Sequence, residues 1–141
     1  MQKRRPEKKA DSSVTVNTLR RKADSLGRDL VKLLHEYAHC SERLSRLRHQ
    51  QGGPLYDPEA EQLAVQQALE SKKGPLPERT VRAILRELHS GARTLVKPLR
   101  VAFLGPTYSY SHLAAIERFG TGAELVPVAT IAAVFEELSR K

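Results

Sequence analysis

Residues 19–47 read LRRKADSLGRDLVKLLHEYAHCSERLSRL, and the spacing of apolar residues in this stretch decides the fold. These residues follow one another at steps of three and four: Leu19, Ala23, Leu26, Leu30, Leu33, Tyr37, Cys40, Leu44 and Leu47. Such a heptad-like stripe is typical of a long helix that buries one seam against other helices. We therefore predict a helix over residues 14–50, with its stripe packed against other helices, and a stripe of this length favours a dimer. It should end at the Gly-Gly-Pro sequence of residues 52–54.

Two shorter helices are predicted to follow the long one. The second starts with Asp57 as N-cap and Pro58 in the first helical position, and Gly74-Pro75 ends it. The third extends from about residue 77 to about residue 96, where Lys97-Pro98 closes it. Three helices of unequal length therefore make up the larger part of the chain.

The sequence pattern changes after Pro98. Residues 100–104 and 124–128 are rich in strand-forming residues, while residues 112–119 and 130–140 have helical patterns. This alternation predicts two parallel strands joined by a right-handed crossover. So short a unit rarely buries enough surface to fold alone. We therefore expect a partial βαβα segment of an α/β domain, so that the fold class is mainly α with a partial α/β end.

Composition excludes several classes of protein. The 141 residues carry a net charge of +8, and no apolar run approaches the ~20 residues of a membrane span. The basic segment 1–13 has no apolar stretch behind it and is predicted to be a disordered tail rather than a secretory signal. A lone Cys40 favours a reducing compartment, and hence the cytoplasm. One cysteine and five scattered histidines do not supply a structural zinc site, so neither a metal nor a cofactor is expected.

Three stretches of the chain point to a known family. They are GPLYDPEAE at residues 53–61, KPLRVAFLGP at residues 97–106 and SHLAA at residues 111–115. Together with the order of the helices, they resemble the bifunctional chorismate mutase–prephenate dehydratases of phenylalanine biosynthesis. The resemblance implies a helical chorismate mutase-like domain over residues 14–97, an intertwined homodimer, and the start of a dehydratase domain over residues 99–141. Its small-molecule ligands would be the dianions chorismate and prephenate.

The resemblance also implies a set of site residues. Arg20 matches an arginine that reaches into the partner subunit's site, and Arg48 stands where the family has a catalytic lysine that binds a carboxylate and the ether oxygen. Asp57 and Glu61 match the acidic residues near the ring hydroxyl. Four positions depart from the family pattern, because charged or polar residues are replaced by Tyr37, Ala60, Ala92 and Val96. Weakened mutase activity is therefore an expectation of the sequence.

The last segment departs from the family as well. Thr107 and Tyr108 stand where the family has an acidic residue and a glycine, and the family's Thr-Arg-Phe tripeptide is absent. We expect no dehydratase activity from these residues. Three functions stay open at this point: a chorismate mutase, a non-catalytic dimerisation module derived from one, and a basic nucleic-acid binder. The last has the least support, since the basic tail has no aromatic residues for base stacking.

Overall fold

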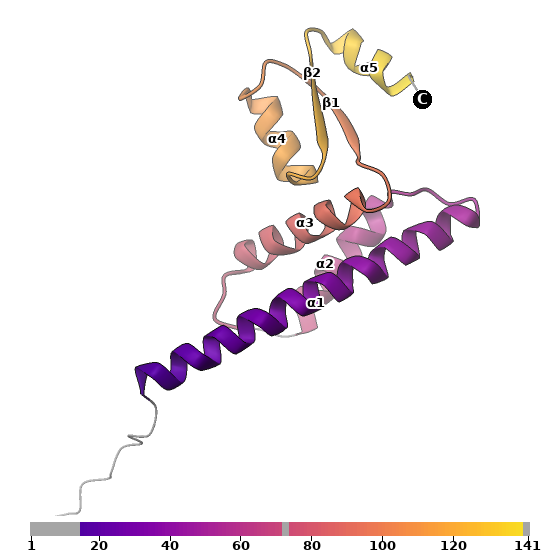
Figure 1. Ribbon diagram of the computed structural model, residues 1–141. Coiled ribbons are helices and arrows are strands. Elements are labelled where there is room, and N and C mark those ends of the chain that lie inside the picture. Colours follow the sequence, from indigo (N-terminus) through magenta and orange to yellow (C-terminus); the bar gives the residue numbers. More distant parts are fainter. Residues whose placement is uncertain (1–14, 72–73, 140–141) are drawn as a thin grey trace, which may run out of the picture. The chain divides into compact units, whose positions relative to one another are not determined.

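The computed structural model describes residues 15–71 and 74–139, which contain five helices and two strands (Figure 1). Their order is α1 (Val16–Gln50), α2 (Pro58–Ser71), α3 (Glu78–Thr94), β1 (Arg100–Leu104), α4 (Tyr110–Phe119), β2 (Glu124–Val128) and α5 (Ile131–Ser139). This order confirms the predicted fold class of three helices followed by a partial α/β segment. The tail at residues 1–13 lies outside the described residues.

The chain divides into two compact units, Met1–His35 and Glu36–Lys141. The described part of the first unit is the beginning of α1, where the Oγ1 of Thr15 accepts a hydrogen bond from the backbone N–H of Thr18 at 3.3 Å. A threonine that caps orphan N–H groups in this way starts a helix. The rest of α1 and all later elements belong to the second unit, which holds every contact described below.

Local signals fix the helix ends in the second unit. Gly52, with a φ of +83°, ends α1, because glycine takes this left-handed conformation without steric cost. The Oδ1 of Asp57 accepts from the backbone N–H of Ala60 at 2.9 Å, which confirms the predicted N-cap of α2. The third helix ends at Thr94, slightly before the predicted end near residue 96. The helix predicted from His112 starts instead at Tyr110, because Ser109 caps it.

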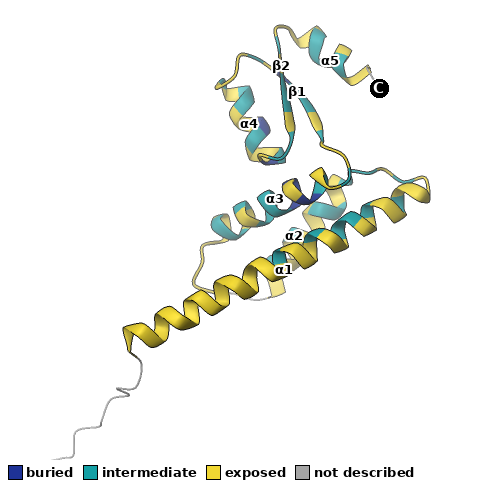
Figure 2. Cartoon of the chain, in the orientation of Figure 1, coloured by how far each residue is buried: buried dark blue, intermediate teal, exposed yellow. Residues whose placement is uncertain are grey.

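The two strands pair in parallel, as predicted, with Arg100 opposite Glu124 and Leu104 opposite Val128. Helix α4 provides the crossover between them, and α4 and α5 lie to either side of the strands in Figure 1. Among the described residues few side chains are buried, and these lie in α3, β1 and α4 (Figure 2): His89, Ser90, Ala92, Phe103 and Ala115. A two-stranded sheet with so small a core matches the expected partial domain.

The α1 stripe, predicted to pack against other helices, is not covered within the single chain. Its six leucines are each more than half exposed, and Cys40, assigned to the core, is exposed. The physical reason is length, because α1 has 35 residues whereas α2 has 14 and α3 has 17. At 1.5 Å per residue, neither shorter helix can cover a stripe of that length.

No helix in the described ranges is both long and apolar enough to cross a membrane.

Candidate functional site

A cavity of about 110 Å³ brings together most of the residues that the sequence singled out. It is lined by residues of the last part of α1, the loop after it, α2 and α3, namely Tyr37, Ser41, Leu44, Ser45, Arg48, Leu55, Asp57, Ala60, Glu61, Ala64, His89, Ala92 and Arg93. The predicted site residues Arg48, Asp57 and Glu61 are therefore neighbours. We call this space the small cavity.

Two predicted positions are not part of the small cavity. Arg20 belongs to the first unit of the chain, where it is exposed on α1. Val96 lines a different cavity, described below. The other three departures from the family pattern, Tyr37, Ala60 and Ala92, do line the small cavity.

Arg48 and Asp57 form an ion pair of 3.4 Å across the loop between α1 and α2. Their side chains are each less than one-third exposed. The loop can approach Arg48 this closely because residue 53 is a glycine. A Cβ at Gly53 would lie 2.7 Å from the Cγ of Arg48, which is closer than van der Waals contact permits. The turn that ends α1 thus also fixes Arg48 at the cavity wall.

Arg93 is a cavity residue that the sequence reading missed. Its Nη1 donates to both carboxylate oxygens of Glu61, at 2.7 and 2.6 Å, and its Nη2 donates to the carbonyl of Phe119 at 2.6 Å. The guanidinium also lies 5.1 Å from the ring centroid of Tyr56, within the range of a cation–π contact. With its side chain only 13% exposed, Arg93 is held from three directions. No local pattern in the sequence marked Arg93, because its partner Glu61 lies 32 residues away along the chain.

Tyr37 and His89 form a neutral pair in the cavity wall. The hydroxyl of Tyr37 lies 2.6 Å from Nε2 of His89, and the two rings stack with centroids 5.6 Å apart. Burial raises the pKa of Tyr37 and lowers the pKa of His89, so both side chains are uncharged at neutral pH. The tautomer of the neutral imidazole sets which of the two groups donates in this hydrogen bond. The resemblance places an arginine at residue 37, whereas this wall carries no charge there.

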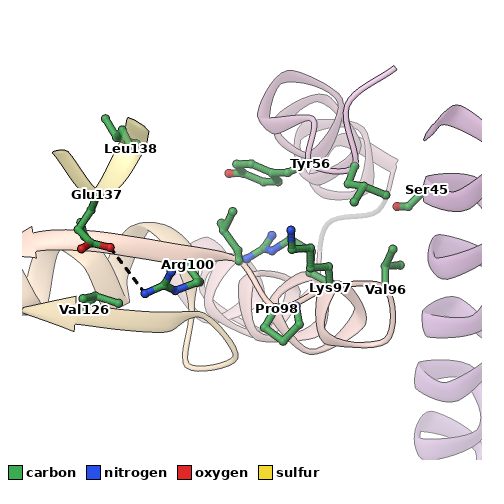
Figure 3. A pocket seen from close by; sticks show the side chains of 13 residues that line it. Ser45, Tyr56, Val96, Lys97, Pro98, Arg100, Val126, Glu137 and Leu138 are labelled. Atoms are coloured by element: carbon green, nitrogen blue, oxygen red, sulfur yellow. Dashed lines mark ion pairs between the residues drawn. The ribbon is translucent and has the colours of Figure 1, made fainter. Parts of the chain in front are cut away.

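A larger cavity of about 380 Å³ lies beside the α3–β1 linker (Figure 3). Val96, Lys97 and Pro98 line it, together with Arg100, whose Nη2 lies 3.7 Å from a carboxylate oxygen of Glu137. Val96 offers no hydrogen bond to a ligand in this space. Among residues 15–71 and 74–139, no group of three His, Cys, Asp or Glu side chains is placed to hold a metal ion.

Comparisons with known proteins identify the family. Residues 19–97 match the model of type II chorismate mutases. The chain belongs to this family. Residues 101–141 match the model of prephenate dehydratases, so the two modules occur in the order that the sequence predicted.

Similar proteins carry both modules in one chain. The bifunctional chorismate mutase/prephenate dehydratase of Pseudomonas aeruginosa is 33% identical over 129 residues, covering 88% of this chain and 35% of that protein. The enzyme of the same name from Aquifex aeolicus is 32% identical over 127 residues, covering 87% of this chain and 35% of that protein. The chain thus spans about one-third of the length of these curated relatives, and corresponds to their N-terminal part.

Proposed function

We propose that this chain is a chorismate mutase module of reduced activity, which rearranges chorismate to prephenate as the N-terminal part of a bifunctional enzyme of phenylalanine biosynthesis. The observation that carries the proposal is the meeting of Arg48, Asp57 and Glu61 in one cavity formed by residues of three helices. These side chains come from separate segments of a chain that belongs to the chorismate mutase family.

The reaction needs positioning and electrostatic stabilisation rather than acids, bases or nucleophiles. Chorismate rearranges by a pericyclic shift, so a protein accelerates it by holding the dianion in its reactive conformer. In the proposed site, Arg48 binds a substrate carboxylate and donates to the ether oxygen, where negative charge grows as the bond breaks. Asp57 and Glu61 accept hydrogen bonds from the ring hydroxyl.

Charge balance supports the reduced activity. The cations Arg48 and Arg93 are each paired with a carboxylate, Asp57 and Glu61, so that the wall of the small cavity is close to neutral. A doubly negative substrate gains little net attraction from such a wall. Ala60 adds no charge where the resemblance implies an arginine.

Cavity size supports a role for a second copy of the chain. Sites for small molecules usually measure about 300–1,000 Å³, whereas the small cavity has about 110 Å³. We propose that a homodimer completes the site, with Arg20 supplied by the partner. The exposed stripe of α1 favours this assembly.

The single thiol, Cys40, favours a cytoplasmic location. We propose no dehydratase activity for residues 99–141.

The test follows the loss of chorismate absorbance with purified protein, against the uncatalysed rate. We expect a small wild-type acceleration that Arg48→Ala removes, while Arg43→Ala, at an exposed position outside the cavity, keeps it. Tyr37→Arg should raise the rate by about tenfold or more, because one donor aimed at developing charge is typically worth 10²–10³. A wild-type rate that Arg48→Ala leaves unchanged would contradict the proposal. Circular dichroism checks that each variant is folded.

A second function is favoured by one specific observation. The leucines of α1 are exposed along the whole helix, which suits a non-catalytic dimerisation module equally well. A stable dimer whose chorismate rate equals the background, both as wild type and as Tyr37→Arg, would establish this alternative.

A further inference from the structure

A concave surface that adjoins the small cavity carries a concentration of arginines. It is a groove of about 360 Å³ formed by residues of α2, α3 and α4. Four of its arginines share one face of α3 at steps of three, four and seven residues, and the fifth comes from α4: Arg79, Arg82, Arg86, Arg93 and Arg118. Residues at these steps lie above one another on a helix, so the guanidinium groups form a row along the groove. We call this surface the arginine groove.

The acidic residues of the groove balance only part of this charge. Glu61 and Glu117 are the two carboxylates in its wall. Glu61 pairs with Arg93 at 2.6 Å, and Glu117 pairs with Arg86 at 2.9 Å. The burial of His89 lowers its pKa, so this neighbour adds no positive charge at neutral pH. Five arginines thus line a wall that holds two carboxylates, while Glu78 and Glu87, outside the wall, pair with Arg82 and Arg86.

Three arginines are left to hold a ligand. Arg82 pairs only with Glu78, in an exposed contact on the same helix that water competes with. Arg79 and Arg118 are exposed, and their side chains make no ion pair or hydrogen bond with any other described residue. Like charges along one helix face destabilise that helix unless something neutralises them. A bound anion would do so.

The concave shape favours a small ligand over a flat contact. Charges of one sign in a recess focus the electrostatic field more strongly than the same charges on a convex surface. The planar guanidinium fork of arginine matches the paired oxygens of phosphates and carboxylates. A volume of about 360 Å³ is within the usual range for small-molecule sites.

We propose that the arginine groove is a second binding site, which takes a small anion with two or more negative charges on phosphoryl or carboxylate groups. Arg79, Arg82 and Arg118 bind the anion directly, while Arg86 and Arg93 remain paired with their carboxylates and add to the field. The groove borders the small cavity and shares Glu61, His89 and Arg93 with it, but the three arginines that bind the anion, Arg79, Arg82 and Arg118, do not line the small cavity, and Arg48 and Asp57 do not line the groove.

The test measures binding of pyrophosphate, and separately of citrate, by isothermal titration calorimetry at constant ionic strength. The two probes distinguish phosphoryl from carboxylate ligands. We expect one site for at least one probe, and an affinity about tenfold or more weaker in the double variant Arg82→Gln/Arg118→Gln. Arg43→Gln removes a charge from an exposed position outside the groove and should bind as the wild type does.

Further variants separate the possible outcomes. Arg48→Ala should leave binding of the probe unchanged if the groove, rather than the small cavity, holds the anion. If the double variant is not folded by circular dichroism, Arg118→Gln alone, at an exposed position, replaces it. Absence of binding, equal weakening by Arg43→Gln, or tighter binding of a DNA duplex than of either anion would overturn the proposal.

Discussion

Tyr108 is the only non-glycine residue with a positive φ in the described part of the chain, at 69°. It stands where the resemblance implies a glycine, the residue that takes this conformation without a steric cost. It is 87% exposed, and its ring makes one edge contact, with His112 at 5.7 Å between centroids, so little packing is lost when the ring is removed. We expect Tyr108→Gly to stabilise the fold by about 1 kcal/mol.

Urea unfolding monitored by circular dichroism measures this gain. Tyr108→Ala is the control, because it removes the ring but keeps the Cβ that disfavours a positive φ. A gain of equal size in both variants would show that the ring, rather than the backbone conformation, is responsible.

The buried imidazole of His89 predicts a dependence of stability on pH. Burial lowers the pKa of His89 below its ordinary value of 6.5, with Arg93 acting in the same direction and Glu61 against both. The unfolded chain therefore takes up a proton on acidification before the folded chain does. Stability is fully present above about pH 6.5 and decreases as the pH falls towards the lower folded value.

Urea unfolding at pH 7.5 and at pH 5.5 tests this dependence. His89→Gln keeps a polar side chain that does not titrate, and it should show a smaller loss of stability between the two pH values than the wild type. The hydrogen bond from the Thr121 hydroxyl lowers the pKa of Glu87 below its ordinary value of 4.5. Protonation of Glu87 therefore affects stability only at a pH below the range of this experiment. An equal loss in both proteins would exclude His89 as the cause.

At the scale of single residues, the family resemblance singled out three residues that lie together in the small cavity. Asp57 was predicted as both N-cap and cavity residue, and Glu61 and Arg48 join it in the small cavity. Arg93 was missed because its partners lie far away along the chain, at Glu61 and at the carbonyl of Phe119. No local pattern reports a pair whose members are 32 residues apart in sequence.

At the scale of the elements, α3 is held to the loop after α4 by a polar seam. Ser90, which is 1% exposed, accepts a hydrogen bond from the backbone N–H of Gly122 at 2.9 Å. Glu87 accepts from the backbone N–H and the hydroxyl of Thr121 at 3.0 and 2.7 Å. The periodicity of α3 predicted the helix but not this seam, because the spacing of apolar residues carries no information on polar contacts to a distant loop.

Gly120 makes the close approach at this seam possible. It has a φ of +76°, and a Cβ at this position would lie 2.5 Å from the Cβ of Ser90. We expect Gly120→Ala to destabilise the fold by at least about 2 kcal/mol, since it adds backbone strain to a steric clash.

Thermal unfolding of matched variants measures the effect of Gly120. Gly91→Ala is the control, because it lies next to Ser90 on α3 and a Cβ there meets nothing within 4 Å. That substitution should be stabilising by up to about 1 kcal/mol through its higher helix propensity. Equal destabilisation by both variants would show that the seam does not depend on Gly120.

At the scale of the whole molecule, the heptad pattern predicted which residues belong to the α1 stripe but not what covers them, and only the length of the stripe pointed to a second copy of the chain. A heptad pattern indicates that a helix face is buried, yet it does not distinguish burial within one chain from burial between two. In the single chain the stripe stays exposed, with Leu47 at 54%. A second copy of the chain packed against α1 is the simplest way to bury the residues of the stripe.

A dimer formed through the stripe makes the thermal midpoint depend on protein concentration, because association stabilises the folded state by mass action. We expect the wild-type midpoint to rise as the protein concentration is increased. Leu47→Glu should remove this rise, because it places a charge in the α1 stripe. Leu63→Glu is the matched control, since Leu63 lies on α2 outside the stripe and is exposed to the same degree, 55% against 54%. Sedimentation velocity should then give a dimer for the wild type and Leu63→Glu, and a monomer for Leu47→Glu. A wild type that sediments as a monomer at all concentrations would exclude assembly through α1.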